Sequence, residues 1–406
     1  MKILMVNKYH YLKGGSEKYY FDLAKLLEEN GHEVAFFSME NEKNIKTENK
    51  EYFVEEIDLN SNNKLKALQV IYSNKNRKKM EQALKDFKPD IVHINNFQRQ
   101  LSSSIITPIK KMNIPIVFTA HDVQAICPAI TMLDSEKNIC EKCKKGKYIN
   151  CVKKKCIKNS SLKSILGAIE GVYYRIKKIY IKKIDLIITP SEFYKTKLIE
   201  DGIKENKIKA IHNFIDTKQY EVENKDEGYA LYFGRLTKEK GILNLVNAFS
   251  KTNSGILYIA GEGEEKENIE RLIKENKLED RVKLLGFLNS FEIKEYIRKC
   301  KFVVVPSIWY ENCPYSIIET LAIGKPLIGS NLGGITELIQ DNENGFIFNY
   351  NNIEDLTNKM NQLFESDSLV EKFSKYSKEL ADKLYSKESY YNKIIEIYNN
   401  LLKEIK

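Results

Sequence analysis

The sequence predicts an α/β protein of two domains, and three observations support this. The chain has 406 residues, and a single α/β domain rarely grows that large. Short apolar runs alternate with helical stretches almost throughout, which is the pattern of βαβ units. Hydrophobic residues make up 42% of the chain, enough to fill two ordinary cores. We therefore expect two parallel sheets, each covered by helices on both faces.

Twelve apolar runs predict the strands. Most are continuous rather than alternating, as expected for strands that are buried on both faces. In chain order they are Ile3–Val6, Val34–Phe37, Ile91–Ile94, Ile116–Thr119, Leu186–Thr189, Ile208–Ile211, Ala230–Phe233, Leu257–Ala260, Val282–Leu285, Phe302–Val305, Leu327–Gly329 and Phe346–Phe348.

Helix boundaries are legible between these runs. Ser16 is placed to cap a helix that Gly31 ends in the left-handed conformation. In the stretch 161–183, apolar side chains recur at spacings of three and four, and we expect their shared face to lie in the core. These side chains are Leu162, Ile165, Leu166, Ile169, Tyr173, Ile176 and Tyr180.

Domain boundaries follow from composition. A polar, acidic stretch separates the two halves, so we place a first domain at 1–212, a linker at 213–227 and a second domain at 228–385. A last apolar-periodic helix occupies 386–406. Five of the seven cysteines fall within 127–156, which we treat as an insertion into the first domain.

The net charge of +9 is concentrated in one segment. Residues 142–183 hold 14 Lys or Arg and one acid, Glu170, so the rest of the chain is slightly acidic. No nucleic-acid-binding module accompanies these charges, which favours an anionic membrane surface as partner; the alternative is a solvated basic face. With no apolar run of membrane-spanning length and no signal peptide, we expect a cytoplasmic protein, peripheral on the inner membrane face.

The segment Phe302–Thr320 carries the strongest chemical signal. A buried strand ends at Pro306, and Pro314 then suits the first turn of a helix. The backbone N–H groups of Tyr315, Ser316 and Ile317 would be available to phosphate or sugar oxygens. Glu311 and Glu319 lie on either side of this helix start, and each carboxylate can accept two hydrogen bonds from a vicinal diol. The alternative is a solvated loop and a helix-surface glutamate.

Three further loops follow predicted strands. Arg235 and Lys240 lie in the loop of Tyr232–Gly241, where fixed cations would stabilise a leaving diphosphate. Gly14 and Gly15 precede the first helix, where they let the backbone approach a ligand. His121 follows the strand that ends at Thr119 and is suited to donate to a sugar hydroxyl. Each loop also admits a purely structural role.

Together these residues resemble the family four retaining glycosyltransferases. The resemblance rests on Gly14-Gly15, His121-Asp122, PSEF at 190–193, HNFID at 212–216, FGRLTKEKG at 233–241 and ENCPYSIIE at 311–319, and covers roughly residues 1–350. Phe214 stands where the family usually has Gly. The resemblance implies the GT-B architecture: two Rossmann-like domains, the first binding the acceptor, the second the nucleotide sugar, and a last helix that crosses back to the first domain.

The resemblance also implies roles for individual residues. The catalytic set is His121, Arg235, Lys240 and Glu311, with His121 contacting the donor sugar, the two cations binding the diphosphate and Glu311 holding the sugar. Glu319 holds the ribose, and Gly286-Phe287 forms the turn that contacts the base. The remaining donor contacts are Gly14, Gly15, Gly234, Glu262, Pro314, Tyr315 and Ser316.

The implied reaction is front-face sugar transfer with retention of anomeric configuration. The donor is a UDP- or GDP-sugar, and the acceptor is a glycan or lipid-linked acceptor in bacterial surface polysaccharide synthesis. Because Arg235 and Lys240 take the place of the divalent cation of D-x-D enzymes, we expect no catalytic metal.

The cysteines suggest a structural zinc. Cys140 and Cys143 have the spacing of a zinc-ligand pair. In a cytoplasmic chain, a cluster of cysteines suggests metal binding rather than disulfide bonds. Cysteine-bearing insertions in relatives favour Cys127, Cys140, Cys143 and Cys156, with Cys151 as an alternative ligand. Reduced free thiols are the main alternative.

Two rival functions stay open. A GT-B sugar-nucleotide epimerase would need further catalytic carboxylates and histidines in the first half. A non-catalytic two-lobed sugar-binding protein would not need Arg235 with Lys240. Turnover distinguishes them, because a binding protein releases no nucleotide diphosphate.

Overall fold

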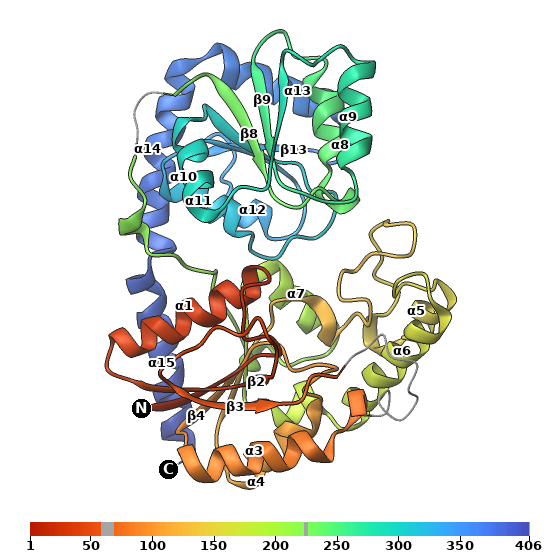
Figure 1. Cartoon of the computed structure of the whole chain (residues 1–406), viewed down its shortest axis with the longest axis vertical. Coiled ribbons are helices and arrows are strands. Elements are labelled where there is room, and N and C mark those ends of the chain that lie inside the picture. The colour runs from red at the N-terminus through yellow and green to blue at the C-terminus, as the bar shows by residue number, and fades with distance from the viewer. Residues whose placement is uncertain (58–68, 223–225, 406) are drawn as a thin grey trace. The chain divides into compact units, whose positions relative to one another are not determined.

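The computed structural model describes residues 1–57, 69–222 and 226–405 and divides into two compact units (Figure 1). The first unit comprises Met1–His212 together with Tyr391–Lys406, and the second comprises Asn213–Tyr390. No helix among the described residues is both long and apolar enough to cross a membrane.

The described part of the first unit is built on one sheet of seven parallel strands. Their order is β3-β2-β1-β4-β5-β6-β7, so the chain reverses its direction of progress between β1 and β4. The strands are β1 (Lys2–Val6), β2 (Glu33–Met39), β3 (Lys50–Val54), β4 (Ile91–Ile94), β5 (Ile116–Thr119), β6 (Leu186–Thr189) and β7 (Ile208–Ala210).

Helices flank these strands (Figure 1). The α-helices described here are α1 (Gly15–Glu29), α3 (Asn74–Phe87), α4 (Ile106–Lys111), α5 (Ile149–Lys153), α6 (Ser161–Ile176), α7 (Glu192–Glu200) and, from Tyr391 onward, α15 (Lys387–Ile405).

The described part of the second unit repeats the plan with six parallel strands in the order β10-β9-β8-β11-β12-β13. Here the reversal falls between β8 and β11. The strands are β8 (Tyr229–Phe233), β9 (Ile256–Ala260), β10 (Val282–Gly286), β11 (Phe302–Val305), β12 (Leu327–Ser330) and β13 (Gly345–Phe348). The helices are α8 (Ile242–Phe249), α9 (Lys266–Glu275), α10 (Ser290–Lys299), α11 (Tyr315–Ala322), α12 (Ile335–Leu338), α13 (Ile353–Glu365) and α14 (Asp367–Leu384).

Both faces of the second sheet are buried. Ala230 and Tyr232 of β8 belong to one apolar cluster, whereas the alternating Tyr229 and Leu231 belong to another. A strand's successive side chains point to opposite faces, so helices must cover both. This is why the continuous apolar runs predicted parallel strands correctly.

The predicted fold class is confirmed, and all twelve predicted strands are present. The strand that the apolar runs did not predict is β3, at the edge of the first sheet. Lys50 and Glu51 of β3 are exposed, and its buried side chains alternate with less buried ones. An edge strand of this kind carries too few apolar residues to stand out as a run.

Two predictions about helices are wrong. Ser16 does not cap α1. The N-cap is Gly14, which has no side chain to make a capping hydrogen bond. The apolar stripe of α6 does not lie in the core, since Leu162, Ile165, Ile169 and Ile176 are 77%, 41%, 49% and 70% exposed. The buried side of α6 carries small and polar residues instead: Ser164, Gly167, Ala168, Glu170 and Tyr174. Tyr180, beyond the helix, is buried as predicted.

The segments around the domain boundary pack within the units. Of the predicted linker, Ile215 and Tyr220 are buried in the core of the second unit, and residues 223–225 lie outside the described residues. In α15, the ring of Tyr390 stacks on Phe214 in the second unit, with 4.3 Å between ring centroids. Later in the same helix, the Tyr398 hydroxyl bonds to His93 Nδ1 at 2.5 Å in the first unit.

Candidate functional site

The reversal point of the second sheet brings two loops together. Gly234–Gly241 follows β8 and Pro306–Pro314 follows β11, and the two strands are neighbours. The Ile308 N–H donates to the Glu239 carbonyl at 2.9 Å, so the loops are bonded directly. In open parallel sheets, ligands bind at the carboxyl ends of the strands at such a point. This edge is therefore the candidate site of the second unit.

Gly241 is required where these loops meet. Its φ is +70°, and a Cβ there would lie 1.9 Å from the Pro306 carbonyl oxygen. A side chain would force the two loops apart. The glycine thus sets the spacing of the residues on either loop.

Lys240 and Glu311 form the centre of the site. Lys240 Nζ lies 2.5 Å from Glu311 Oε1, and both side chains are largely buried. Ser307 Oγ and Trp309 Nε1 donate to the same oxygen at 2.7 and 2.8 Å. Lys240 Nζ also lies 5.6 Å from the centroid of the Trp309 ring.

These contacts keep Glu311 ionised. Burial alone would raise the pKa of the Glu311 carboxyl, but the charge of Lys240 and the hydrogen bonds from Lys240, Ser307 and Trp309 outweigh it and lower the pKa. All three described donors reach Oε1. Oε2 is therefore the oxygen suited to accept from a ligand hydroxyl.

The backbone of Glu311 is held by the loop after β12. Gly334 N–H donates to the Glu311 carbonyl at 2.8 Å. Gly333 has φ +60°, and a Cβ there would lie 2.3 Å from the same oxygen. Ser330 Oγ donates to the Ser307 carbonyl at 2.6 Å. Sequence reasoning missed this support: two consecutive glycines three residues after a predicted strand indicate a tight loop, but they do not reveal that the loop holds Glu311.

Arg235 lies on the same loop as Lys240 but is not brought into contact with it. Its side chain is 64% exposed, and Nη2 lies 3.8 Å from Glu239 Oε1. Tyr232 Oη donates to the Arg235 carbonyl at 2.7 Å, which fixes the backbone while the guanidinium reaches outward. An exposed, always-charged guanidinium at a site's edge is suited to meet an incoming anion.

Fewer backbone N–H groups are available at the start of the helix after Pro314 than predicted. Pro314 is the N-cap of α11, and no side chain caps the helix. Ile317 N–H donates to the Pro314 carbonyl at 3.1 Å, so the prediction that this group is available to a ligand is wrong. Tyr315 and Ser316 remain at the first turn, where a helix favours negative charge.

Asn213 fastens the same loop from the HNFID segment, a role that sequence reasoning did not assign. Asn213 Nδ2 donates to the Cys313 carbonyl at 2.9 Å, and its backbone N–H to Cys313 Sγ at 3.4 Å. Further along α11, Glu319 Oε1 accepts from Tyr220 Oη at 3.5 Å.

The strands on the other side of β8 present the predicted base-side residues. Gly261 N–H donates to the Gly286 carbonyl at 2.7 Å, which joins the loop after β9 to the last residue of β10. Glu262 pairs with Lys266 at 3.1 Å. Phe287 is 76% exposed, so its ring is open to stacking.

The first unit carries a different group of side chains at its carboxyl edge. His121 Nε2 lies 2.8 Å from Asn95 Oδ1, and its ring meets Tyr19 edge-on with 4.7 Å between centroids. Thr119 Oγ1 lies 3.1 Å from Tyr19 Oη and 2.7 Å from His93 Nε2. Burial lowers the pKa of His121 to about 3, and burial with the neighbouring His121 lowers that of His93 to about 3. Both imidazoles are therefore neutral at pH 7.

Gly14 and Gly15 begin α1 at the same end of the first unit. Both are exposed. Gly14 has φ −175°, an extended conformation that any residue adopts, so its backbone does not require glycine. Behind it, the buried Glu17 accepts from Asn7 Nδ2 at 3.4 Å. A glycine without a backbone reason is consistent with close approach by a ligand.

The cysteines of the insertion are close enough to influence one another but do not form a metal site. Among the described residues, no group of three or more His, Cys, Asp or Glu side chains is arranged to hold an ion. All five are free thiols, and burial first, then neighbouring thiols, raise the pKa of Cys143 to about 12. The residues as placed do not fit the predicted zinc, so no role is derived through it.

Comparison with known proteins identifies the family. Residues 213–380 match the model described as Glycosyl transferases group 1, and residues 13–219 match the one described as Glycosyltransferase Family 4. An uncharacterized 42.6 kDa protein in the cps region of Klebsiella pneumoniae is 27% identical over 83% of this chain and 87% of its own length. The chain belongs to the family four, group 1 glycosyltransferases.

Two further comparisons extend this finding. The N-acetylgalactosamine-N,N'-diacetylbacillosaminyl-diphospho-undecaprenol 4-alpha-N-acetylgalactosaminyltransferase of Campylobacter jejuni is 29% identical over 48% of this chain and 55% of its own. The structure of Anabaena HepE in complex with UDP has a TM-score of 0.72, with 17% identity over 98% of this chain and 100% of that one. The latter likeness shows the fold, the two-domain GT-B architecture.

Proposed function

We propose that this chain is a retaining hexosyltransferase that moves a sugar from a UDP-sugar to a glycan or lipid-linked acceptor in bacterial surface polysaccharide synthesis. The observation that carries the proposal is the Lys240–Glu311 pair at the reversal point of the second sheet. The cps-region relative, the Campylobacter enzyme and the UDP-bound neighbour support the pathway, acceptor and donor in turn.

Lys240 has the hydrogen-bonding capacity for two partners. An ammonium group has three donors, so Lys240 can keep Glu311 and still donate to a phosphate oxygen. Arg235, exposed on the same loop, supplies a second cation. As the bond between the anomeric carbon and the diphosphate oxygen breaks, charge grows on that oxygen, and fixed cations stabilise it.

Glu311 is proposed to orient the donor sugar. Its Oε1 is held by Lys240, Ser307 and Trp309, and Oε2 accepts from a sugar hydroxyl. Tyr315 and Ser316 present backbone N–H groups to the sugar or phosphate, and Glu319 accepts from the ribose diol. The exposed ring of Phe287, with Glu262 and Gly286 beside it, receives the base.

The first unit is proposed to hold the acceptor. A neutral His121 donates to, or accepts from, a hydroxyl of the donor sugar without adding charge. Gly14 and Gly15 let the ligand approach α1 closely, and Gly234 does so on the loop of Arg235. In front-face transfer the acceptor hydroxyl attacks the anomeric carbon, and the departing phosphate oxygen takes its proton.

A thermal-shift screen with UDP, GDP, ADP and their sugar conjugates tests the donor site. A ligand that binds only the folded state raises the unfolding temperature. We expect UDP to raise it in the wild type and in Lys238→Ala, an exposed lysine of the same loop, but not in Arg235→Ala.

Three results would count against parts of this proposal. A shift with GDP instead of UDP would change the donor base. A shift that survives Arg235→Ala would remove the diphosphate assignment. Ligand binding with no release of nucleotide diphosphate in the presence of glycan acceptors would favour a binding protein. The anomeric configuration of the product, read from its proton coupling constant, decides between retention and inversion.

A further inference from the structure

The outward side of α6 is almost wholly aliphatic. Six of its sixteen residues are exposed, and all but Ser161 are apolar. The five recur at spacings of three and four, which places them along one side of the helix. We call them the outer face of α6: Leu162, Ile165, Ile169, Val172 and Ile176, which are 77%, 41%, 49%, 44% and 70% exposed.

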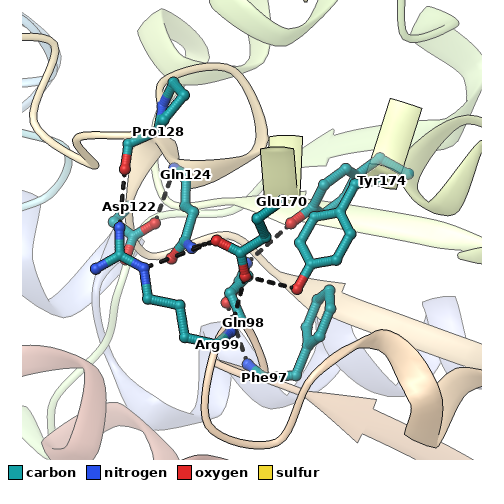
Figure 2. Close-up of polar contacts among 9 residues, drawn as sticks. Phe97, Gln98, Arg99, Asp122, Gln124, Pro128, Glu170 and Tyr174 are labelled. Carbon is teal, nitrogen blue, oxygen red and sulfur yellow. Dashed lines mark hydrogen bonds and ion pairs between the residues drawn. The ribbon is translucent and has the colours of Figure 1, made fainter. Parts of the chain in front are cut away.

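The opposite side of α6 is held by a buried carboxylate (Figure 2). Glu170 is 3% exposed, and its Oε1 accepts from the Arg99 backbone N–H at 2.9 Å and from Tyr174 Oη at 2.8 Å. Its Oε2 accepts from Gln124 Nε2 at 3.3 Å and lies 3.7 Å from Arg99 Nε. Arg99 Nη2 in turn donates to the Pro128 carbonyl at 2.8 Å.

These contacts fix the rotation of the helix. Turning α6 to bury its isoleucines would expose Glu170 and break its ion pair with Arg99. Leaving a buried carboxylate without its partner is strongly destabilising, so these contacts favour the observed setting of the helix. The aliphatic side is therefore exposed because the acidic side is anchored.

Exposed lysines lie at both ends of this face, and α6 itself, which is described throughout, has no exposed acid. Lys158 precedes α6 and is exposed, and Lys177, Lys178 and Lys182 follow it and are exposed. Glu170, the only acid in residues 142–183, points inward. A second apolar side chain, Ile149, is 59% exposed on α5, which packs against α6. The surface thus combines an apolar stripe with positive charge at its ends.

We propose that the outer face of α6 docks on an anionic lipid bilayer, with the helix lying parallel to the membrane surface. The stripe from Leu162 to Ile176 spans about 21 Å at 1.5 Å per residue. Amphipathic helices of this kind bury their apolar side at the boundary of head groups and acyl chains, while lysines meet anionic lipid. The inference rests on the proposed function in one respect: a lipid-linked acceptor brings the enzyme to a bilayer.

Charge favours a bilayer over a second copy of this chain. Two copies packed through the same face would bring the lysines at the helix ends together, and α6 has no exposed acid to offset them. An anionic lipid surface supplies both the apolar layer and the opposite charge.

Co-sedimentation of the full chain with vesicles tests the proposal. The vesicles are phosphatidylcholine alone, or phosphatidylcholine with about 30% phosphatidylglycerol at low and high salt. We expect binding to the anionic vesicles only, weakened by salt. The variant Ile165→Gln with Ile169→Gln should bind at least tenfold more weakly, and Lys177→Gln with Lys182→Gln should lose the salt dependence. Met112→Gln, which changes a 44% exposed apolar side chain at the C-cap of α4, is the matched control and should bind as the wild type does.

Four outcomes would overturn it. These are equal binding to both vesicle types, undiminished binding of the isoleucine variant, equal weakening by Met112→Gln, or a concentration-dependent dimer that the isoleucine variant abolishes. The UDP thermal shift is measured on every variant, because the donor site lies in the second unit. Loss of vesicle binding with a preserved UDP shift isolates the membrane face, and no UDP shift in the wild type contradicts the proposed function instead.

Discussion

The two units share one sheet plan but carry different kinds of side chain at the point where the strand order reverses. At β8 and β11 of the second unit, a buried ion pair of Lys240 and Glu311 occupies this edge of the sheet. At β1 and β4 of the first unit and the adjoining β5, neutral imidazoles, amides and hydroxyls do so, and all five histidines of the chain lie in this unit. Fixed charge suits a phosphate, whereas neutral donors suit hydroxyl groups. The comparison indicates that the shared fold fixes where a site lies, whereas the side chains of the loops determine which ligand it binds.

The largest expected effect comes from removing the ion pair of the second unit. Lys240→Ala should lower kcat by roughly 100- to 1,000-fold, because the leaving diphosphate loses a fixed cation. It should also lower the free energy of unfolding by about 3 kcal/mol, because Glu311 stays buried without its partner. Initial-rate kinetics and chemical denaturation measure the two effects.

A double variant separates the two roles of Lys240. Lys240→Ala with Glu311→Gln leaves no unpaired buried charge, so stability should recover while transfer stays lost. Lys238→Ala, an exposed lysine two residues away, should change neither. Recovery of transfer in the double variant would show that Lys240 serves only to neutralise Glu311.

The next prediction concerns mild acid, which should lower the stability of the first unit before that of the second. Burial, against the opposing charge of Glu51, lowers the pKa of His10 to about 4, and His93 and His121 lie at about 3. Between pH 6.5 and 4.5 the unfolded chain binds protons at these histidines and the folded chain does not. The first unit should therefore lose up to about 1.4 kcal/mol per pH unit for each histidine as pH falls.

The second unit should resist this pH range. The pKa of Glu311 lies below its usual value, so the stability it contributes is present above about pH 4.5 and is lost only at lower pH. Hydrogen exchange at decreasing pH checks the order. Loss of protection in β8 and β11 before β1, β4 and β5 would contradict the comparison.

The smallest effect concerns the spacing of the loops. Gly241→Ala should cost about 2 kcal/mol of stability and weaken UDP binding, because its Cβ would strike the Pro306 carbonyl. Gly228→Ala is the matched control: Gly228 also has a positive φ, +80°, in the same unit, but apart from its chain neighbours no atom of the described residues lies within 4 Å of the added Cβ. It should show only the backbone strain of about 1 kcal/mol and normal UDP binding. Equal UDP binding in both variants would show that loop spacing does not matter.

Much of the architecture could be predicted because a strand that is buried on both faces consists of consecutive apolar residues. Glu311 and Lys240 could be found because each follows such a run at a recognisable spacing. Gly333 and Asn213 could not, since their roles depend on contacts with residues 22 and 100 positions away. Periodicity located the stripe of α6 but not its direction, because the buried Glu170 and its partner Arg99 lie 71 residues apart.

The placement of α15 has a consequence for biosynthesis. Ile394 and Tyr398 are fully buried in the first unit, and Tyr398 bonds to His93 of β4. The ribosome makes β1 to β7 first, yet their core is closed by residues that emerge after the whole second unit. The first unit is therefore the earliest to be synthesised and the last to be completed, and a nascent chain must carry an unfinished apolar surface until its final helix arrives.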